Sequence, residues 1–186
     1  QVAISADGNT IVARDARNGG LVFYTRTSGG WTGQDINLRG IDTFDMSSFG
    51  YGATAAISAD GNTVAIGIPD VTPVYDGPVL GGVYVFVKNA VGNWIQQGRR
   101  LTGTGGVPST TAAAQGTSIA ISADGNTIIE GAPTDNNNQG AVWIFSRTAG
   151  VWAQMGSKLV GTGNTGAAQQ GYSVSISADG NTAMAG

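Results

Sequence analysis

The chain has 186 residues, with nine Lys and Arg against twelve Asp and Glu, and a formal net charge of −3. Gly accounts for 31 of them, more than twice the usual share of about 7%. This charge balance excludes an electrostatic footprint for nucleic acid, and the 41% of hydrophobic residues excludes the composition of a disordered chain.

The sequence contains neither Cys nor His. It therefore lacks a disulfide framework, a thiolate metal site and the commonest general base. No stretch approaches the roughly 20 apolar residues of a membrane helix, so we expect no membrane insertion. Gly, Thr, Ser, Asn and Gln dominate the polar positions, which favours a secreted or cell-surface protein.

One seven-residue sequence, Ile-Ser-Ala-Asp-Gly-Asn-Thr, occurs four times. Each copy places Asp-Gly between two apolar runs, which is a strong β-hairpin signal. The spacing of about 57 residues indicates a repeat architecture. The copies begin at Ile4, Ile57, Ile121 and Ile176.

Further features follow the first three copies in the same order. Each is followed by an alternating apolar run (21–24, 83–87 and 141–145), then by a Gly-containing turn, a Trp and a Leu-x-Gly sequence. In the third unit the predicted strands are 117–122, 127–131, 141–147 and 151–159. No segment shows a helical period with caps.

Four short strands per unit predict an all-β chain of β-propeller blades, each made of four antiparallel strands. The chain holds about three and a half such blades. We expect blade 1 with its connection at 1–48, blade 2 at 49–114, blade 3 at 115–170 and a half-blade of two strands at 171–186. Two interpretations stay open: a segment of a longer propeller, or a chain completed by a neighbouring subunit.

The blades resemble the FG-GAP repeats of integrin-α-like propellers. Phe49-Gly50 and Gln115-Gly116 open two units, and Gly131-Ala132-Pro133 closes one as in that family. The resemblance implies a toroidal fold with a role in adhesion or surface recognition. Many members also hold Ca²⁺ in an Asp-rich loop between the first two strands.

The calcium ligands of that family are mostly missing here. Around Asp60 the positions that should carry ligands are Ala56, Ser58 and Val64, and one carboxylate per loop does not hold Ca²⁺ tightly. We therefore interpret Asp7, Asp60, Asp124 and Asp179 as turn residues and expect no cofactor. Asp135 is the one candidate for a cation site.

The sequence offers few catalytic groups. Glu130 is the only Glu and replaces the Ala13, Ile66 and Ala185 of the other units. We interpret it as a paired edge or tunnel position, with an active-site acid as the rival. Asp42 and Asp45 form the only close carboxylate pair, which we assign to loop solvation. These observations predict a protein that is not an enzyme.

Two groups of residues are candidates for binding a partner or a glycan. Trp31, Trp94 and Trp152 occupy the same phase in three units, which favours packing, with a set of glycan-stacking platforms as the rival. The loops between second and third strands vary most, and variable loops on a repeated scaffold often bind ligands. They contain Tyr75, Asp76, Asn136 and Asn137.

From the resemblance and this inventory we expect a non-catalytic adhesion protein or a self-assembling scaffold whose half-blade is completed by a neighbour. A lectin-like propeller that uses the repeated Trp residues is the alternative. The expected partners are further copies or neighbouring blades, a glycan or a surface protein.

Overall fold

The computed structural model describes residues 2–14, 21–36, 54–69, 80–108, 114–163 and 166–186. Three four-stranded antiparallel sheets follow one another along the chain, and a two-stranded sheet ends it. Blade 1 consists of β1 (Val2–Ile4), β2 (Thr10–Arg14), β3 (Leu21–Thr27) and β4 (Gly30–Ile36). Blade 2 consists of β5 (Thr54–Ile57), β6 (Thr63–Ile68), β7 (Gly82–Lys88) and β8 (Trp94–Gln96).

Blade 3 consists of β9 (Ser118–Ile121), β10 (Thr127–Ala132), β11 (Ala141–Thr148) and β12 (Val151–Gln154). The half-blade pairs β13 (Val174–Ile176) with β14 (Ala183–Ala185). In each sheet the strands lie in chain order. The predicted all-β architecture of four-stranded antiparallel blades is confirmed, and the arrangement is a partial β-propeller.

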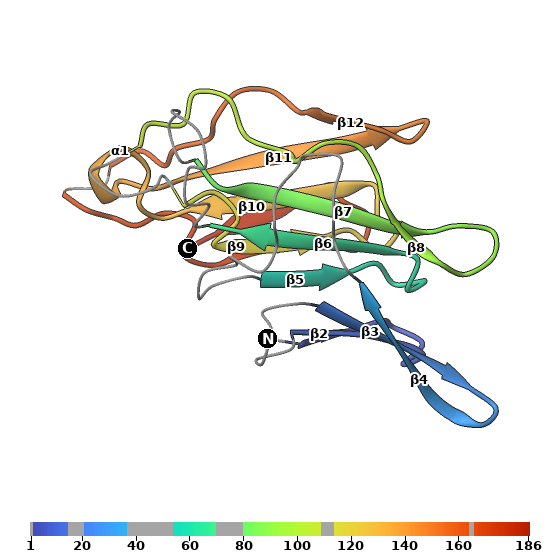
Figure 1. Ribbon diagram of the computed structural model, residues 1–186. Coiled ribbons are helices and arrows are strands. Elements are labelled where there is room, and N and C mark those ends of the chain that lie inside the picture. Colours follow the sequence, from blue (N-terminus) through green and yellow to red (C-terminus); the bar gives the residue numbers. More distant parts are fainter. Residues whose placement is uncertain (1, 15–20, 37–53, 70–79, 109–113, 164–165) are drawn as a thin grey trace.

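The blades stack face to face, with blade 1 lowest in Figure 1 and blade 2 above it. One core lies between blades 1 and 2, where Val12 and Phe23 pack against Ile66, Phe86 and Trp94. A second lies between blades 2 and 3, where Val83 and Val85 meet Ile128. The hydrophobic residues therefore stabilise the stack by filling the spaces between sheets.

The heptapeptide turns lie together at one end of the stack, which we call the turn end (residues 5–10, 58–63, 122–127 and 177–182). Within each turn the Asp carboxylate accepts hydrogen bonds from the Ser hydroxyl and from the Asn backbone and side-chain amides. The Ser hydroxyl in turn accepts the Thr backbone amide. These contacts agree with the predicted turn role of the four Asp residues.

Backbone hydrogen bonds also join consecutive turns. The Ala6 amide donates to the Ala59 carbonyl, Ala59 to Ala123, and Ala123 to Ala178, at 2.9–3.1 Å. The glycine that follows each Asp lies against the Thr of the preceding turn, as Gly125 does against Thr63. The repeated sequence thus specifies both a hairpin and a contact between neighbouring blades.

The opposite end carries the segment α1 (Asp135–Asn138) and the connection from blade 2 to blade 3; we call it the loop end (Figure 1). α1 is an irregular turn, because Asn136 and Asn137 have φ of 48° and 56°. No helix among the described residues is long and apolar enough to cross a membrane.

Candidate functional site

The repeated Trp residues take different positions. Trp94 is 6% exposed and packs against Phe23 at 4.6 Å between ring centroids. Trp152 is half-buried, and its indole N–H donates to Gln97. Trp31 is 46% exposed on blade 1. Two of the three rings thus pack at blade interfaces, and the packing interpretation fits their surroundings better than a set of equivalent platforms.

The predicted loop residues are only partly within the described chain. Tyr75 and Asp76 lie outside the described residues. The Asn136 backbone amide donates to the Val107 carbonyl at 3.0 Å, and the Asn136 side chain donates to Gln139 at 2.5 Å. The side chain of Asn137 is exposed to solvent at the loop end.

Asp135 is completely buried beneath this loop. One carboxylate oxygen accepts the Val107 amide at 2.6 Å and the other accepts Lys158 Nζ at 2.8 Å. The cation beside Asp135 is therefore the Lys158 ammonium group. Among the described residues no three acidic side chains lie close enough together to hold a metal ion.

Three completely buried polar side chains surround residues 101–107, which connect blades 2 and 3; we call Gln115, Glu130 and Asp135 the buried polar cluster. The Gln115 amide binds both the N–H and the C=O of Gly103. A Cβ added at Gly106 would lie 2.7 Å from Gln115 Nε2 and 3.7 Å from Asp135 Oδ1. Gln115 and Asp135 therefore fasten the connection from both sides.

Glu130 is the unusual member of the cluster. It lies on β10, opposite Trp143 of β11 and Ile119 of β9, and neither carboxyl oxygen has a hydrogen-bond partner in the described structure. Burial raises the pKa of Glu130 to about 8, although the nearby Gly103 amide, whose hydrogen bond goes to Gln115, and the Arg100 charge act in the opposite direction. At neutral pH the side chain is therefore mostly a neutral acid.

The sheet register confirms that Glu130 replaces an apolar residue of the repeat. Ile66 lies opposite Tyr84, Ala13 opposite Val22 and Glu130 opposite Trp143, each on the second strand of its blade. The break in the repeat was thus the sequence signal that located this group. Gln115 and Lys158 carried no comparable signal, since their partners are set by how the blades stack.

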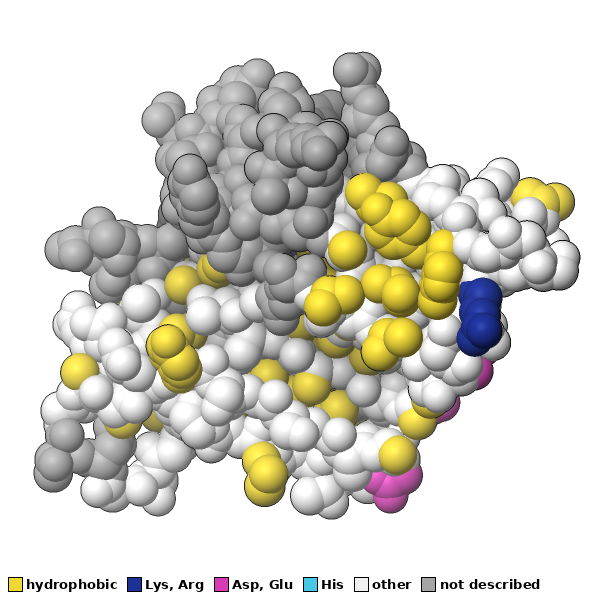
Figure 2. Space-filling view, turned by 90° about the horizontal axis from the view of Figure 1, so that it is seen from below, with side chains coloured by type: hydrophobic (Ala, Val, Ile, Leu, Met, Phe, Trp, Pro, Cys, Tyr) yellow, Lys and Arg dark blue, Asp and Glu magenta, His cyan; other side chains and the backbone are white. Residues whose placement is uncertain are grey.

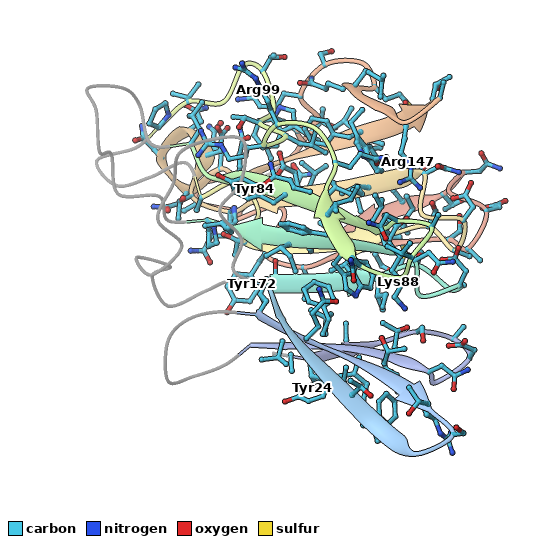
Figure 3. All side chains as sticks on the ribbon, turned by 45° about the vertical axis from the view of Figure 1, so that its right-hand side comes forward. Tyr24, Tyr84, Lys88, Arg99, Arg147 and Tyr172 are labelled. Atoms are coloured by element: carbon cyan, nitrogen blue, oxygen red, sulfur yellow. The ribbon has the colours of Figure 1, made fainter. Side chains whose placement is uncertain are left out.

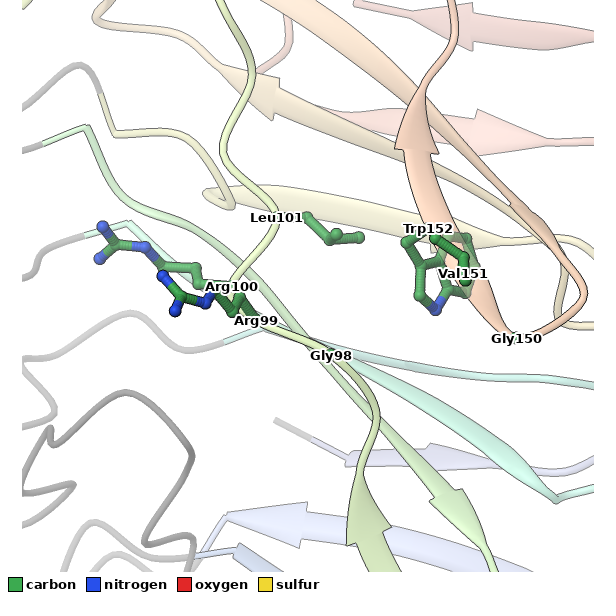
Figure 4. Close-up of a pocket in the computed structure, with 7 residues that line it drawn as sticks. All are labelled: Gly98, Arg99, Arg100, Leu101, Gly150, Val151 and Trp152. Carbon is green, nitrogen blue, oxygen red and sulfur yellow. The ribbon is translucent and has the colours of Figure 1, made fainter.

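A groove of about 330 Å³ lies on the outer side of the stack, between residues 98–101 and the turn of the β11–β12 hairpin. Figure 4 shows Leu101 and Trp152 facing one another across it, while the side chains of Arg99 and Arg100 extend away from Trp152. The part of the groove between Leu101 and Trp152 is therefore apolar, and the two guanidinium groups lie at the surface beside it.

No family model matches the sequence, and no curated protein matches it significantly. Similar solved structures include a candidate 6-phosphogluconolactonase from Bacteroides fragilis, with TM-score 0.55 and 16% identity over 86% of this chain. A protein of unknown function from Desulfotomaculum acetoxidans matches with TM-score 0.56 and 19% identity over 99% of the chain. TolB from Acinetobacter baumannii matches with TM-score 0.51 and 12% identity over the whole chain.

The chain spans less than half of these proteins: 38% of the Bacteroides protein, 47% of the Desulfotomaculum protein and 37% of TolB. At such low identity the similarity shows the fold, which is that of propellers.

The comparisons correct the FG-GAP assignment. The similar structures are lactonase-like and TolB propellers, so the predicted integrin-like family was wrong. The motif has a general physical cause. A Cβ at Gly131 would lie 2.1 Å from the Gly171 carbonyl oxygen, and one at Gly67 would lie 2.2 Å from that of Gly116. These glycines are therefore explained by the close approach of neighbouring blades, and they do not indicate one particular propeller family.

The predicted function is corrected with it. The predicted non-catalytic adhesion protein rested on the FG-GAP resemblance, the self-assembling scaffold on the half-blade, and the lectin-like alternative on the repeated Trp residues. Two Bacteroides structures that match with TM-score 0.55 are named as candidate 6-phosphogluconolactonases, and they contradict the prediction that the protein is not an enzyme.

Proposed function

We propose that the chain is part of a propeller enzyme that hydrolyses the lactone of a phosphorylated sugar acid. In this reaction a water oxygen adds to the lactone carbonyl carbon and the ring C–O bond breaks. The ring oxygen leaves as a hydroxyl group, taking up a proton, and the product is the open-chain acid. Two Bacteroides propellers of similar fold are named as candidate 6-phosphogluconolactonases.

The observation that carries the proposal is Glu130, a buried acid close enough to Arg100 for their charges to interact. It breaks an otherwise apolar repeat, and strongly perturbed titratable groups are concentrated at functional sites. Its side chain is completely buried. We therefore assign Glu130 as a positioning residue that acts through Arg100 and the 101–107 connection.

In this assignment Arg100 attracts the anionic group of the substrate. Below about pH 8 Glu130 is neutral and does not attract the Arg100 guanidinium group. Above that pH the buried carboxylate attracts the guanidinium group and weakens its hold on an anion. KM for the phosphorylated lactone should therefore rise above about pH 8, while kcat changes less.

The test measures acid release from 6-phosphogluconolactone and from unphosphorylated gluconolactone, above the spontaneous rate, across pH. We expect Arg100→Gln to raise KM about tenfold for the phosphorylated lactone and less for the other. Glu130→Gln should remove the rise of KM above pH 8. Arg99→Gln is the matched control, because it removes the same charge from the neighbouring residue.

Hydrolysis no faster than the spontaneous rate with both lactones would overturn the proposed activity. Equal effects of Arg99→Gln and Arg100→Gln would overturn the assignment of Arg100, and a KM profile unaffected by Glu130→Gln would overturn that of Glu130.

A secreted or surface location, predicted from composition, is part of the same proposal. Its support is the surface chemistry of the sequence, with many Gly, Thr, Ser and Asn residues and no Cys. Fractionation of the source cells tests it, and recovery of the protein with cytosolic markers would contradict it.

A further inference from the structure

The groove between residues 98–101 and the turn of the β11–β12 hairpin is a second candidate binding site, which we call the outer groove. Of its lining residues, the proposed function uses only Arg100. Leu101 forms one wall and Trp152 the other, as Figure 4 shows. The volume of about 330 Å³ lies at the lower end of the range for small-molecule sites, about 300–1,000 Å³. A ligand of one or two rings therefore fits the outer groove.

The Trp152 wall is held in one orientation by polar contacts. Its indole N–H donates to Gln97 Oε1 at 3.0 Å, and the same oxygen accepts a hydrogen bond from Arg147 at 2.9 Å. The Arg147 guanidinium group also lies over the Trp152 ring, 5.2 Å from its centroid. A ligand therefore meets a ring that is already ordered, which lowers the entropic cost of binding.

The Leu101 wall is held by the backbone. The Leu101 amide donates to the Val83 carbonyl at 2.8 Å, and the Val83 amide donates to the Leu101 carbonyl at 2.9 Å. Leu101 and Trp152 both pack against the hydrophobic core between blades 2 and 3. The separation of the two walls is therefore set by how these blades pack.

Two glycines border the outer groove where the chain turns. Gly98 has φ of 76° and Gly150 has φ of 81°, a region that residues with a side chain rarely adopt. A Cβ at Gly98 would have no neighbouring atom within 4 Å, and one at Gly150 would lie 3.7 Å from Gln97 Nε2. The backbone conformation, rather than crowding, therefore keeps side chains away from these two borders.

One side of the outer groove carries positive charge. Arg99 and Arg100 line it, and Figure 4 shows both guanidinium groups extending away from Trp152. In Figure 3 Arg99 lies at the upper side of the stack, on the opposite side from Tyr24 of blade 1. Arg99 is exposed, whereas Arg100 is half-buried and its charge acts on Glu130. None of the described residues that line the groove is acidic, so an anionic group complements this side of it.

We propose that the outer groove binds a small aromatic carboxylate, with its ring between Leu101 and Trp152 and its carboxylate beside the Arg99 guanidinium group. The Trp152 ring stabilises a stacked aromatic ring by more than the buried area alone. A guanidinium group binds a carboxylate through two parallel hydrogen bonds. The assignment does not depend on the proposed lactonase activity, because that activity uses neither Trp152 nor Arg99.

An exposed aromatic ring elsewhere provides an internal control. Trp31 of blade 1 is 46% exposed, and Figure 2 shows hydrophobic side chains gathered on the lower face of the molecule, where blade 1 lies. A ligand that only stacks on any exposed indole ring binds Trp31 as well as Trp152. A ligand of the outer groove binds Trp152 alone.

The probes are 2-naphthoate and 2-naphthamide, which share one ring system and differ in charge. Calorimetry with the purified chain measures both dissociation constants, and NMR of the isotope-labelled chain follows the indole N–H signals. 2-Naphthoate should bind about fivefold more tightly than 2-naphthamide, because it contacts an exposed guanidinium group. It should shift the Trp152 signal, which is assigned by its loss in Trp152→Phe, and leave the Trp31 signal in place.

Variants of the chain locate the anionic group. Arg99→Gln should weaken 2-naphthoate about fivefold and leave 2-naphthamide unchanged. Arg26→Gln is the matched control, because it removes an exposed Arg of blade 1, and it should affect neither probe. Decahydro-2-naphthoate, which keeps the carbon skeleton and the charge without the aromatic ring, should bind more weakly than 2-naphthoate.

Several outcomes would overturn the proposal. They are no binding of 2-naphthoate, equal binding of the two naphthyl probes, equal binding of the saturated probe, and equal effects of the two Arg variants. A shift at Trp31 as large as that at Trp152 would show unspecific stacking and would also overturn it. Tighter binding of the peptide Gly-Gly-Trp, which carries an aromatic side chain beside its terminal carboxylate, would assign the groove to a peptide end instead of a small molecule.

Discussion

At the turn end the Ser, Asp, Asn and Thr of every heptapeptide make the same four hydrogen bonds in all four turns. At the loop end Glu130 stands in blade 3 where the other blades have Ala13, Ile66 and Ala185. The first region repeats because each turn must fit its neighbours. The second varies because the hydrogen bonds of the turn and the ladder between turns do not constrain it.

The comparison shows that the loop end, unlike the turn end, accommodates a buried carboxyl group. A buried carboxyl without a hydrogen-bond partner destabilises a fold, and here it lies under a connection fastened by Gln115 and Asp135. The turn end, in contrast, places its carboxylates at the surface with complete hydrogen bonding. Variants at the two ends should therefore differ in size of effect and in pH dependence.

The largest expected effect concerns the approach of blade 3 to the half-blade. Gly131→Ala would place a Cβ 2.1 Å from the Gly171 carbonyl oxygen, so the blades must separate, at a cost of about 4 kcal/mol or loss of folding. Gly8→Ala at the turn end has φ of 68° but open space around it, so it should cost only about 1 kcal/mol. Urea unfolding measures both, and equal costs would contradict this account.

The second effect depends on pH. The pKa of Glu130 is raised to about 8 from 4.5. Its contribution to stability is therefore fully present below about pH 4.5 and is lost as the pH rises through 8. Glu130→Gln should remove this loss, making the variant about 2–4 kcal/mol more stable relative to the parent at pH 9 than at pH 4. An equal difference in unfolding free energy between Glu130→Gln and the parent at the two pH values would contradict the raised pKa.

A third variant tests the repeated turn. Ser122 is completely buried; its hydroxyl donates to Asp124 at 2.5 Å and accepts the Thr127 amide at 2.9 Å. Ser122→Ala should cost about 1–2 kcal/mol, because it leaves that amide without a partner. The matched change Ser177→Ala, in the more exposed half-blade, should cost less. Thermal unfolding compares them, and a larger loss for Ser177→Ala would reverse the expected order.

The smallest effect is expected for Lys88, at the end of β7. Lys88→Met removes the contact with the Thr10 hydroxyl and the charge over the Trp94 ring, but it keeps an apolar stem of similar length. The expected cost is about 0.5–1 kcal/mol. It should shrink in high salt, where the electrostatic part is screened. A cost independent of salt would show that Lys88 acts through packing alone.

The sequence predicted the blades because their information is local. Asp-Gly turns, alternating apolar runs and the period of the heptapeptide define four strands without reference to other parts of the chain. Glu130 was also found from the sequence, because it interrupts that period, but the predicted edge or tunnel position was wrong. Its side chain is completely buried on β10, which lies between β9 and β11. The apparent FG-GAP motif did not identify the family, because Gly67 and Gly131 lie where two blades approach too closely for a Cβ.

Contacts between blades could not be predicted in the same way. Lys158 reaches Asp135 across 23 positions, and Arg147 reaches Thr63 across 84. Such pairs depend on the stacking of complete sheets, which no local pattern of residues specifies. The common phase of the three Trp residues predicted packing, but it did not separate Trp94 and Trp152, which pack at blade interfaces, from Trp31, which is 46% exposed.

The ladder of alanine hydrogen bonds at the turn end gives the stack a direction. Every link donates from the earlier blade to the later one, from Ala6 to Ala59, Ala123 and Ala178. Each blade consequently has a donating side and an accepting side that are not interchangeable. A blade turned over within the stack would set two donors or two acceptors against each other, so the ladder fixes the direction of every blade as well as holding the blades together.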